Sequence, residues 1–507
     1  MPPRRGLLQA AVAGALAGTV ALGTAELTAG LTRARSLVTA IGDAVIAKSP
    51  EGLVEYGKRT FGTDDKAVLV AGILVIAGCA AAALGVAARR RPAVAVAGFA
   101  AFGALGIAAV AREPTGSVGL GALASAIGVG CGLAALVALL GGRKAAPAPV
   151  DPSRCAFLGL AAAAGATAAV SGAIGRALLH HAVTAAVRAR LVLPRPVVPS
   201  APPPAGATLA VDGVTPLVTS NDRFYLIDAT LSYPAVDVER WRLRIDGMVE
   251  HPFEISFNDL LAMPMIEQYV TLGCVSNEVG GDLVSTAAWR GVRLVDLLRR
   301  ARVRPGATQV VGRSVDDFTV GFPTEAALDD RGAMVAVGMN GEPLPVAHGF
   351  PARLIVPGLY GYVSATKWLR QIELSTFEAF DAYWVRRGWA QQAPIKTQSR
   401  IDVPNGNHRL TAGPVAVAGV AWAPTRGISR VEVQVDDNAW HEAVLAQALS
   451  ADTWRQWIYQ WNAPSGGHRL RVRATDGTGQ LQDERVHPPM PDGATGYHTV
   501  HLEVSNA

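Results

Sequence analysis

The sequence predicts a multidomain chain: an α-helical transmembrane bundle, then an α+β domain, then an immunoglobulin-like β-sandwich. Three observations support this fold class. Half of the 507 residues are hydrophobic and only 17% are charged, and the apolar excess lies before residue 190. A proline-dense segment follows, and after it the chain carries ordinary charge and its tryptophans. Alternating, strand-like runs then fill the last part of the chain, so several domains of different type are expected.

Residues 1–190 are predicted to form a membrane domain of about five transmembrane helices. A helix of about 20 apolar residues crosses about 30 Å of hydrocarbon. Glu26 makes the first of these segments the least uniform, and the charged stretch 32–66 is expected to be a loop. The expected spans lie near residues 7–31, 67–88, 93–111, 117–140 and 155–175.

Basic residues flank alternate spans, and such residues favour the cytoplasmic side of a membrane. An odd number of spans then predicts a multi-pass protein of the cell membrane whose C-terminal half is extracytoplasmic. Residues 153–158 also resemble a twin-arginine export signal, with Cys155 in place of the second arginine. The basic residues of the three loops are Arg4, Arg5, Arg89, Arg90, Arg91, Arg143, Lys144 and Arg154.

Residues 191–208 are predicted to be a Pro-rich linker, because proline at this density favours extended polyproline geometry. Residues 209–390 are predicted to be a catalytic domain of short mixed elements. Residues 241–247, 309–312 and 353–356 have the character of strands that end in turns, while 258–261 and 292–301 have helical spacing.

Residues 391–507 are predicted to form the β-sandwich. Alternating runs recur there at fairly regular spacing, separated by turns such as Asp436-Asp437-Asn438. No helix is expected in this part. The alternating runs are residues 414–422, 428–435, 454–461 and 468–474.

The charge and the cysteines exclude several classes of function. The formal charge of +5 is spread over both halves, and the longest Lys/Arg run is Arg89-Arg90-Arg91, so no nucleic-acid partner is expected. Cys274 is the only cysteine after the linker, so a disulfide framework is not expected there. Neither a haem-binding motif nor a flavin or NAD module is recognisable.

The most informative segment is Thr271-Leu-Gly-Cys274-Val-Ser-Asn277-Glu278-Val-Gly280-Gly281-Asp282. An apolar run that ends at a cysteine can place the thiolate at the end of a strand. A soft thiolate suits a heavy metal, and neighbouring glycines let a bulky cofactor approach the backbone. On spacing alone, a buried structural thiol remains the stronger interpretation of Cys274.

Four motifs in order add a resemblance to a known family. They are Asn-Asp-x-Phe-Tyr at 221–225, Cys-x-x-Asn at 274–277, His-Gly-Phe-Pro-x-Arg at 348–353 and Gly-Tyr-x-Ser-x-x-Lys-Trp at 361–368. With them, residues 215–385 resemble the molybdopterin domain of the sulfite oxidase family. The C-terminal β part resembles the dimerisation domain of that family, which implies a possible homodimer.

The resemblance implies a Mo-molybdopterin cofactor, with Cys274 as the protein ligand of the metal and as the catalytic residue. His348 and Arg353 would hold the pterin and its phosphate, and a planar guanidinium suits phosphate because it can form two parallel hydrogen bonds. Arg313 is a weaker candidate. The remaining residues implied to bind the cofactor are Asp222, Phe224, Tyr225, Asn277, Ser314, Ser364, Thr366 and Lys367.

The chain departs from the animal members of that family where substrate is selected. Those proteins carry an arginine pair after the Cys-x-x-Asn motif, and this chain has Glu278 and Val279 there. A dianion such as sulfite would lose cationic partners. Arg290, Arg293 and Arg387 are further candidates to reach the site.

Three functions follow as hypotheses. The first is oxygen-atom or two-electron transfer on a small oxyanion or sulfur-oxo compound, with a separate protein or quinone as electron partner. The second is an extracytoplasmic methionine-sulfoxide-type reductase. The third is a non-enzymatic, membrane-tethered binding module that uses the β-sandwich.

Overall fold

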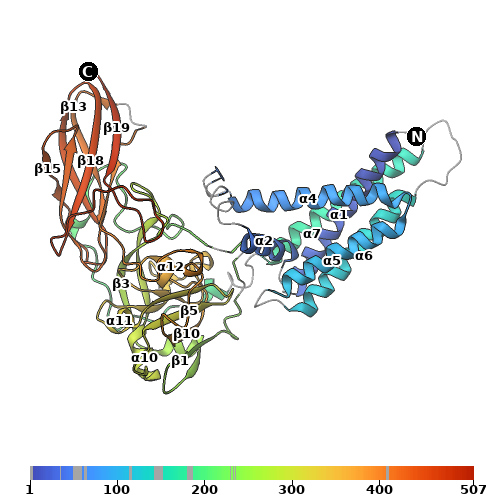
Figure 1. Ribbon diagram of the computed structural model, residues 1–507, viewed down its shortest axis with the longest axis horizontal. Helices are drawn as coiled ribbons and strands as arrows, with labels where there is room; N and C mark the ends of the chain where they lie inside the picture. Colours follow the sequence, from blue (N-terminus) through green and yellow to red (C-terminus); the bar gives the residue numbers. More distant parts are fainter. Residues whose placement is uncertain are drawn as a thin grey trace. The chain divides into compact units, whose positions relative to one another are not determined.

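The computed structural model describes residues 4–32, 34, 36–49, 57, 60–61, 65–112, 117–141, 152–179, 187–228, 230–231, 233–234, 236–406 and 410–506. The chain divides into two compact units. We call Met1–Ala186 with Asp228–Ala235 the helical unit, and Val187–Ile227 with Val236–Ala507 the mixed unit. Figure 1 shows helices in the first and mainly strands in the second.

The helical unit contains five helices that are long and apolar enough to cross a membrane. Their apolar windows agree with the predicted spans to within a few residues. A short helix, α2, stands in the stretch that we expected to be a loop. The helices are α1 (Arg4–Thr32), α2 (Leu37–Lys48), α4 (Asp65–Ala88), α5 (Pro92–Val110), α6 (Val118–Gly141) and α7 (Pro152–Leu179).

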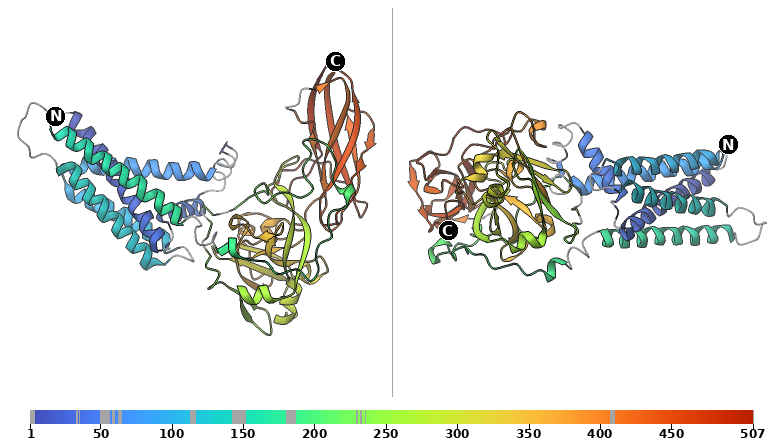
Figure 2. Two further views of the ribbon diagram at one scale, coloured as in Figure 1. Left: turned by 180° about the vertical axis from the view of Figure 1, so that it is seen from behind. Right: turned by 90° about the horizontal axis from the view of Figure 1, so that it is seen from below.

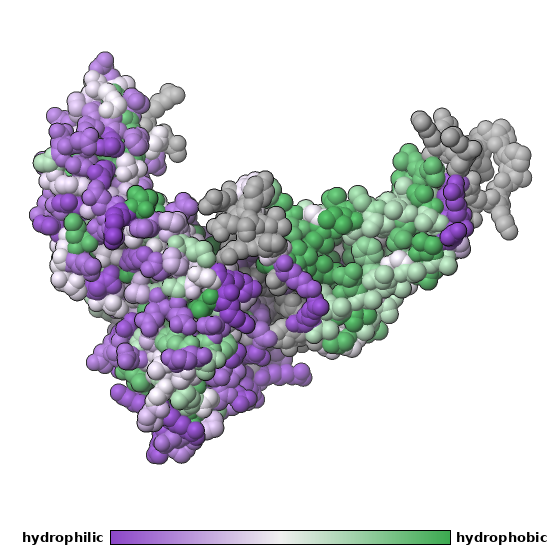
Figure 3. Space-filling model, viewed as in Figure 1, coloured by the Kyte–Doolittle hydropathy of each residue, from purple (hydrophilic) through white to green (hydrophobic). Residues whose placement is uncertain are grey.

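Small residues let α1 approach its neighbours at backbone distance. A Cβ atom at Gly14 would lie 2.2 Å from the carbonyl oxygen of Ala81 in α4. A Cβ atom at Gly23 would lie 2.6 Å from the carbonyl oxygen of Ala168 in α7, and one at Gly128 of α6 would lie 2.7 Å from that of Ala21. Close packing of this kind is typical of helices in membranes. Figure 3 shows the apolar surface that the helices leave outside.

Glu26, the one acid in the first span, is buried and accepts a hydrogen bond of 2.7 Å from the hydroxyl of Ser36. Ser36 precedes α2 and caps its first turn, so the carboxylate lies beside the positive end of that helix. This contact explains how α1 accommodates an acid that makes the first span less uniform.

The start of α1 lies beside the end of α4, so the first two of the three predicted basic segments share one end of the helical unit. A Cβ atom at Gly6, near the start of α1, would lie 2.6 Å from the Arg89 guanidinium at the end of α4. Arg143 and Lys144 lie outside the described residues, as do His180 and His181. The side chains of Ser153, Arg154, Cys155 and Ala156, in the twin-arginine-like segment, also lie outside the described part of the chain.

Residues 191–206 are extended, as the prolines predict, and they lie along the mixed unit. The amide of Val197 donates to the carbonyl of Met265 (2.8 Å), and Glu267 donates back to Val198 (2.9 Å). Val198 therefore forms a parallel β-bridge with Ile266 of β3.

The first half of the mixed unit is the α+β region, built on two sheets with orders β2-β1-β10-β5-β6 and β3-β4-β7-β8, where β9 also pairs with β7. The predicted strands and helices at 241–247, 258–261, 292–301, 309–312 and 353–356 are all present. The elements are η2 (Ala205–Ala207), β1 (Arg242–Gly247), β2 (Phe253–Ser256), α9 (Phe257–Ala262), β3 (Met265–Gly273), β4 (Val284–Arg293), α10 (Leu294–Ala301), β5 (Gln309–Ser314), β6 (Thr319–Pro323), α11 (Thr324–Leu328), β7 (Met334–Met339), β8 (Glu342–Pro343), η3 (Val346–His348), β9 (Arg353–Ile355), α12 (Gly361–Ser364), β10 (Leu369–Ser375) and η4 (Val385–Arg387).

The second half is the β-rich region, visible in both views of Figure 2. Its two sheets have orders β11-β13-β17-β16 and β12-β19-β18-β14-β15. Their inner faces share one core that includes Val417 and Trp457 from the first sheet and Val433 and Val472 from the second. The strands are β11 (Gln398–Val403), β12 (Leu410–Thr411), β13 (Gly413–Trp422), β14 (Ile428–Val435), β15 (Trp440–Glu442), β16 (Val444–Leu445), β17 (Arg455–Ala463), β18 (Gly466–Asp476) and β19 (His498–Ser505).

Candidate functional site

Cys274 directly follows β3, so the structure confirms that this thiol lies at the end of a strand. Val270 and Leu272 anchor the strand in the core of the α+β region. The Cys274 amide donates to the carbonyl of Leu283 (2.8 Å), and the Leu283 amide donates to the side-chain oxygen of Asn277 (2.8 Å). These bonds close residues 274–283 into a loop, which we call the cysteine loop. The buried Cys274 is its first residue and lies where the two ends of the loop meet.

Two tyrosines lie beside Cys274. A Cβ atom at Gly273 would be 3.7 Å from the Tyr360 ring, and one at Gly361 would be 3.4 Å from the Tyr225 hydroxyl. Burial raises the pKa of both phenols, and the negative charge of Cys274 raises the pKa of each further. Both tyrosines therefore keep their protons at neutral pH.

His348 and Arg353 form a second group. The His348 Nε2 atom lies 3.0 Å from the carbonyl oxygen of Asn221, and the ring of Phe224 meets the imidazole edge to face at 5.5 Å. Arg353 is buried, donates to the His348 carbonyl (3.1 Å) and stacks its guanidinium over Trp289 at 4.9 Å. The motif at 221–225 therefore meets the motif at 348–353, as the resemblance implies.

Thr366 and Lys367 lie next to this group. The Thr366 hydroxyl is buried and has no hydrogen-bond partner among the described residues. A Cβ atom at Gly312 would lie 2.4 Å from that hydroxyl, so a larger residue at 312 would block it. A Cβ atom at Gly349 would touch Lys367 at 3.0 Å and Arg353 at 3.1 Å. The Lys367 ammonium donates to the Ile227 carbonyl at 3.3 Å.

The other predicted binding residues have local roles in this structure. Asp222 is exposed, and a hydrogen bond from Ser220 holds the pKa of its carboxyl below the usual value. The hydroxyl of Ser314 accepts from the Asp316 amide (3.3 Å), and that of Ser364 donates to the Tyr360 carbonyl (3.0 Å). Arg313 pairs with Glu373 at 2.6 Å. For these residues, binding to a cofactor stays a prediction.

Two of the three additional arginines are turned to other partners. Arg290 pairs with Glu267 at 2.7 Å, and their position on the β3–β4 ladder is six residue pairs from Gly273. Arg293 is the last residue of β4, at the end away from the cysteine loop. For these two residues, a role at the site stays a prediction. Arg387 stacks on Tyr383 at 3.7 Å.

Sequence reasoning missed Tyr360, Trp289, Gly312 and Gly349. The only signal for Tyr360 is its position just before Gly361, and Trp289 reads as an ordinary core residue of β4. Gly349 has a φ of 107°, which favours glycine, and it follows the predicted His348. Gly349 stands within the motif at 348–353, whereas Tyr360, Trp289 and Gly312 lie outside the four motifs.

A molybdopterin cofactor fits this set of donors. The buried Thr366 hydroxyl can bind a polar group of the cofactor, and the thiolate of Cys274 is a soft ligand for molybdenum. Arg353 and Lys367 supply the cations that a phosphate requires. The four side chains come from segments up to 93 positions apart, since Cys274 and Lys367 mark the ends of that interval.

Comparison with known proteins points the same way. Residues 230–384 match the family described as oxidoreductase molybdopterin binding domain. The chain is 29% identical to mitochondrial sulfite oxidase of Rattus norvegicus over 339 residues, which is 57% of this chain and 62% of that protein. It is 36% identical over 153 residues to the uncharacterized oxidoreductase YuiH of Bacillus subtilis, covering 30% of this chain and 74% of that protein.

A solved structure shares the fold. Sulfane dehydrogenase SoxCD from Paracoccus pantotrophus superposes with a TM-score of 0.51 at 24% identity, over 59% of this chain and 85% of that chain. The chain spans about three fifths of the length of the curated mitochondrial sulfite oxidases that it matches, with 62% of the rat protein and 58% of the Macaca fascicularis protein covered.

Proposed function

The chain belongs to the sulfite oxidase family of molybdopterin-dependent oxidoreductases, and on this premise we propose that it is a membrane-anchored enzyme for oxygen-atom transfer. The observation that carries the proposal is that the buried residues Cys274 and Arg353 both act electrostatically on Tyr225. In the oxidising direction, water would supply the oxygen atom and release two protons, and two electrons would leave the substrate. In the reducing direction the same atoms and electrons would move the other way.

Each residue has a role that its contacts support. When bound, the cofactor supplies the redox change of molybdenum between its hexavalent and tetravalent states. Cys274, the first residue of the cysteine loop, would bind the metal. Tyr225 and Tyr360, which stay protonated, offer O–H donors beside the thiolate. His348 and Arg353 hold the pterin, and Thr366 and Lys367 hold its polar groups.

The charges of the cysteine loop favour a neutral sulfur-oxo substrate over a dianion. Glu278 and Asp282 are exposed on the loop. The guanidinium that contacts it, from Arg400, already pairs with Asp402 at 2.6 Å. A carboxylate-bearing loop repels sulfite more than a sulfoxide. A reductase of the methionine-sulfoxide type is therefore the second candidate, and it differs from an oxidase in the direction of electron flow.

The remaining parts support a membrane-bound arrangement of this enzyme. Five apolar helices would anchor it in the cell membrane as a multi-pass protein. The shared basic end at Gly6 and Arg89 supports a cytoplasmic location for that end and an extracytoplasmic mixed unit. We include in the proposal an immunoglobulin-like β-rich region, a homodimer, and a separate protein or quinone as the electron partner.

Metal and pterin analysis of detergent-purified chain, made in a host that synthesises the cofactor, tests the proposal. We expect about one molybdenum per chain, following the single ligand Cys274, and a changed or lost molybdenum signal in Cys274→Ser. Turnover of sulfite with an artificial acceptor, and of methionine sulfoxide with an artificial reductant, then separates the two candidates. A wild-type protein without molybdenum would refute the enzyme and favour the tethered binding module.

A further inference from the structure

One arginine of the β-rich region, Arg400, forms a hydrogen bond with the cysteine loop. Arg400, on β11, is buried at 8% exposure and donates from Nη1 to the carbonyl oxygen of Gly281 at 2.7 Å. Gly281 lies in the second half of the cysteine loop, and 119 positions separate the two residues in the chain. The contact therefore joins the predicted metal ligand's loop to a region that carries none of the predicted cofactor residues.

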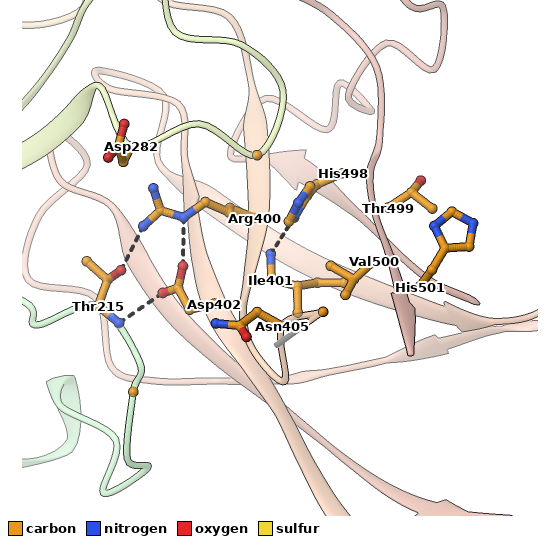
Figure 4. Close-up of a pocket in the computed structure, with 13 residues that line it drawn as sticks. Thr215, Asp282, Arg400, Ile401, Asp402, Asn405, His498, Thr499, Val500 and His501 are labelled. Carbon is orange, nitrogen blue, oxygen red and sulfur yellow. Dashed lines mark hydrogen bonds and ion pairs between the residues drawn. The ribbon is translucent and has the colours of Figure 1, made fainter. Parts of the chain in front are cut away.

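The other donors of Arg400 fix the direction of its guanidinium, as Figure 4 shows. Nε donates to Asp402 at 2.6 Å, and Nη2 donates to the Thr215 hydroxyl at 2.7 Å. The Thr215 amide in turn donates to Asp402 at 2.9 Å, which closes a ring of three residues. Because a guanidinium is planar and its donors lie at fixed angles, this ring determines where Nη1 points.

His498, on β19, supports the same loop from the side. Its Nδ1 accepts from the amide of Ile401 at 3.0 Å, and burial, aided by the charge of Arg400, lowers the pKa of the imidazole to about 4. The ring is therefore neutral near pH 7 and carries its proton on Nε2. A Cβ atom at Gly280 would lie 2.2 Å from this ring, so only glycine fits there.

The strand that leads to Cys274 is also held by the β-rich region. The Thr271 amide donates to the carbonyl of Asp452 at 2.9 Å, and the Trp454 amide donates to the Thr271 hydroxyl at 2.7 Å. Thr271 is fully buried and lies three residues before Cys274. The thiol thus lies between two points of attachment, at Thr271 and at Gly281.

A pocket of about 550 Å³ lies next to the cysteine loop, and Arg400 is one of its lining residues. Gly280 and Asp282 line one part of this pocket, and His498 and His501 line another. The His498 ring packs on Gly280 at the edge of this pocket. The hydrogen bond from Arg400 to Gly281 adds a direct polar link between this part of the loop and the β-rich region.

We infer that Arg400 is a positioning residue for Cys274, which makes the β-rich region part of the machinery of the molybdenum site. The inference rests on the proposed function, in which Cys274 binds the metal. Loss of the Nη1 bond would release the Gly281 carbonyl and let the thiolate move relative to the pterin. Groups that orient a metal ligand from outside typically change metal affinity or activity by about 10- to 100-fold.

Substitution of Arg400 by Gln and by Lys tests this, with Arg426→Gln as the matched control. Arg426 is the same residue type in the same region, with the same kinds of partner: a carboxylate, a backbone carbonyl and a threonine hydroxyl. Its partners are Asp476, Ile395 and Thr397, none of which belongs to the cysteine loop. Arg400 is buried and the Arg426 side chain is 25% exposed. Both substitutions remove a hydrogen-bonded arginine, so a general loss of packing should affect both.

The first measurement is the rate at which iodoacetamide alkylates Cys274 in the cofactor-free full chain, followed by site-resolved mass spectrometry. We expect a rise of about 10-fold in Arg400→Gln, a smaller rise in Arg400→Lys, and less than about 2-fold in Arg426→Gln. The second is the electron paramagnetic resonance signal of pentavalent molybdenum in loaded protein, which should shift in Arg400→Gln and not in Arg426→Gln.

Equal alkylation rates in wild type and Arg400→Gln, or an equal rise in Arg426→Gln, would overturn the inference. If Arg400→Gln does not fold, Thr215→Val removes only the anchor of Nη2 and should still raise the rate by about 2- to 3-fold, within the range of a lost neutral hydrogen bond; no rise there overturns the inference too. The alkylation result needs no metal, so it stays distinct from a failure to find molybdenum, which would refute the proposed function instead.

Discussion

The helical unit and the mixed unit bury different kinds of group. In the helical unit, Gly14 and Gly85 meet at backbone distance while Ile76 is 70% exposed. In the mixed unit, Arg353 is 4% exposed, and its guanidinium rests on Trp289. Helices in hydrocarbon gain nothing by hiding apolar side chains, so they associate through small residues. In water the apolar side chains are buried, and a buried cation then requires partners.

This difference indicates where the chemistry lies. The mixed unit buries His348 and Arg353, which the resemblance assigns to the cofactor, whereas the buried Glu26 of the helical unit lies at the start of α2. The same substitution should therefore have different consequences in the two units.

The largest effect is expected for Cys274→Ser. Loss of the thiolate should lower turnover by at least about 100-fold, because a metal ligand matters more than the groups that orient it. The same substitution at Cys131 in α6 should leave turnover and molybdenum content unchanged. Steady-state turnover and metal analysis of both purified variants check this, and a loss of activity in Cys131→Ser would contradict the division of roles between the units.

Arg353→Met should come next. Removal of the guanidinium leaves the cofactor phosphate with fewer charge-assisted hydrogen bonds, so pterin affinity should fall about 10- to 100-fold. Fluorescence of the oxidised pterin, measured per chain, reports the occupancy. Arg473→Met, which breaks the pair with Glu432 in the β-rich region, serves as the control. Unchanged pterin content in Arg353→Met would remove this residue from the proposed site.

In the helical unit, Gly85→Leu should weaken the packing of α4 on α1. A Cβ atom at Gly85 would lie 2.3 Å from the Ala10 carbonyl, so the helices must separate, at a cost of about 1–3 kcal/mol. A Cβ atom at Gly78 on the same helix would have no other atom within 4 Å, so Gly78→Leu should leave the stability of the helix packing unchanged. Loss of helicity during a detergent titration measures the effect. Molybdenum content should stay unchanged in both, and a fall in Gly85→Leu alone would show that the units are coupled.

The smallest effect concerns pH and the β-rich region. The His498 imidazole has a pKa of about 4, below its ordinary 6.5, so the unfolded chain binds its proton first as pH falls. The contribution of His498 to the free energy of unfolding is fully present above pH 6.5 and is lost as the pH falls toward 4. We expect this loss to lower the melting temperature by about 5 °C over the same pH window. His498→Asn keeps an acceptor for Ile401 and should flatten the curve; an unchanged pH dependence of melting would disprove the assignment.

The sequence by itself determined the five long apolar helices and the motif residues. Each span is one continuous apolar segment, and its length is a local property. The strand at 428–435 was equally readable from its alternation, and that at 309–312 from the turn that follows it. The stretch that contains α2 was wrongly expected to be a loop, because its surroundings are charged and the bond from Ser36 to Glu26 depends on the fold of α1.

Only the tertiary structure decided how the β-rich region meets the cysteine loop. Periodicity reports which face a side chain occupies and not what lies opposite. Arg400 and His498 lie outside the predicted runs, and Trp454 reads as an ordinary residue of an alternating run. Their partners Gly281, Gly280 and Thr271 are more than 100 positions away in the chain. Such contacts are set when two folded regions pack, so they exist only in three dimensions.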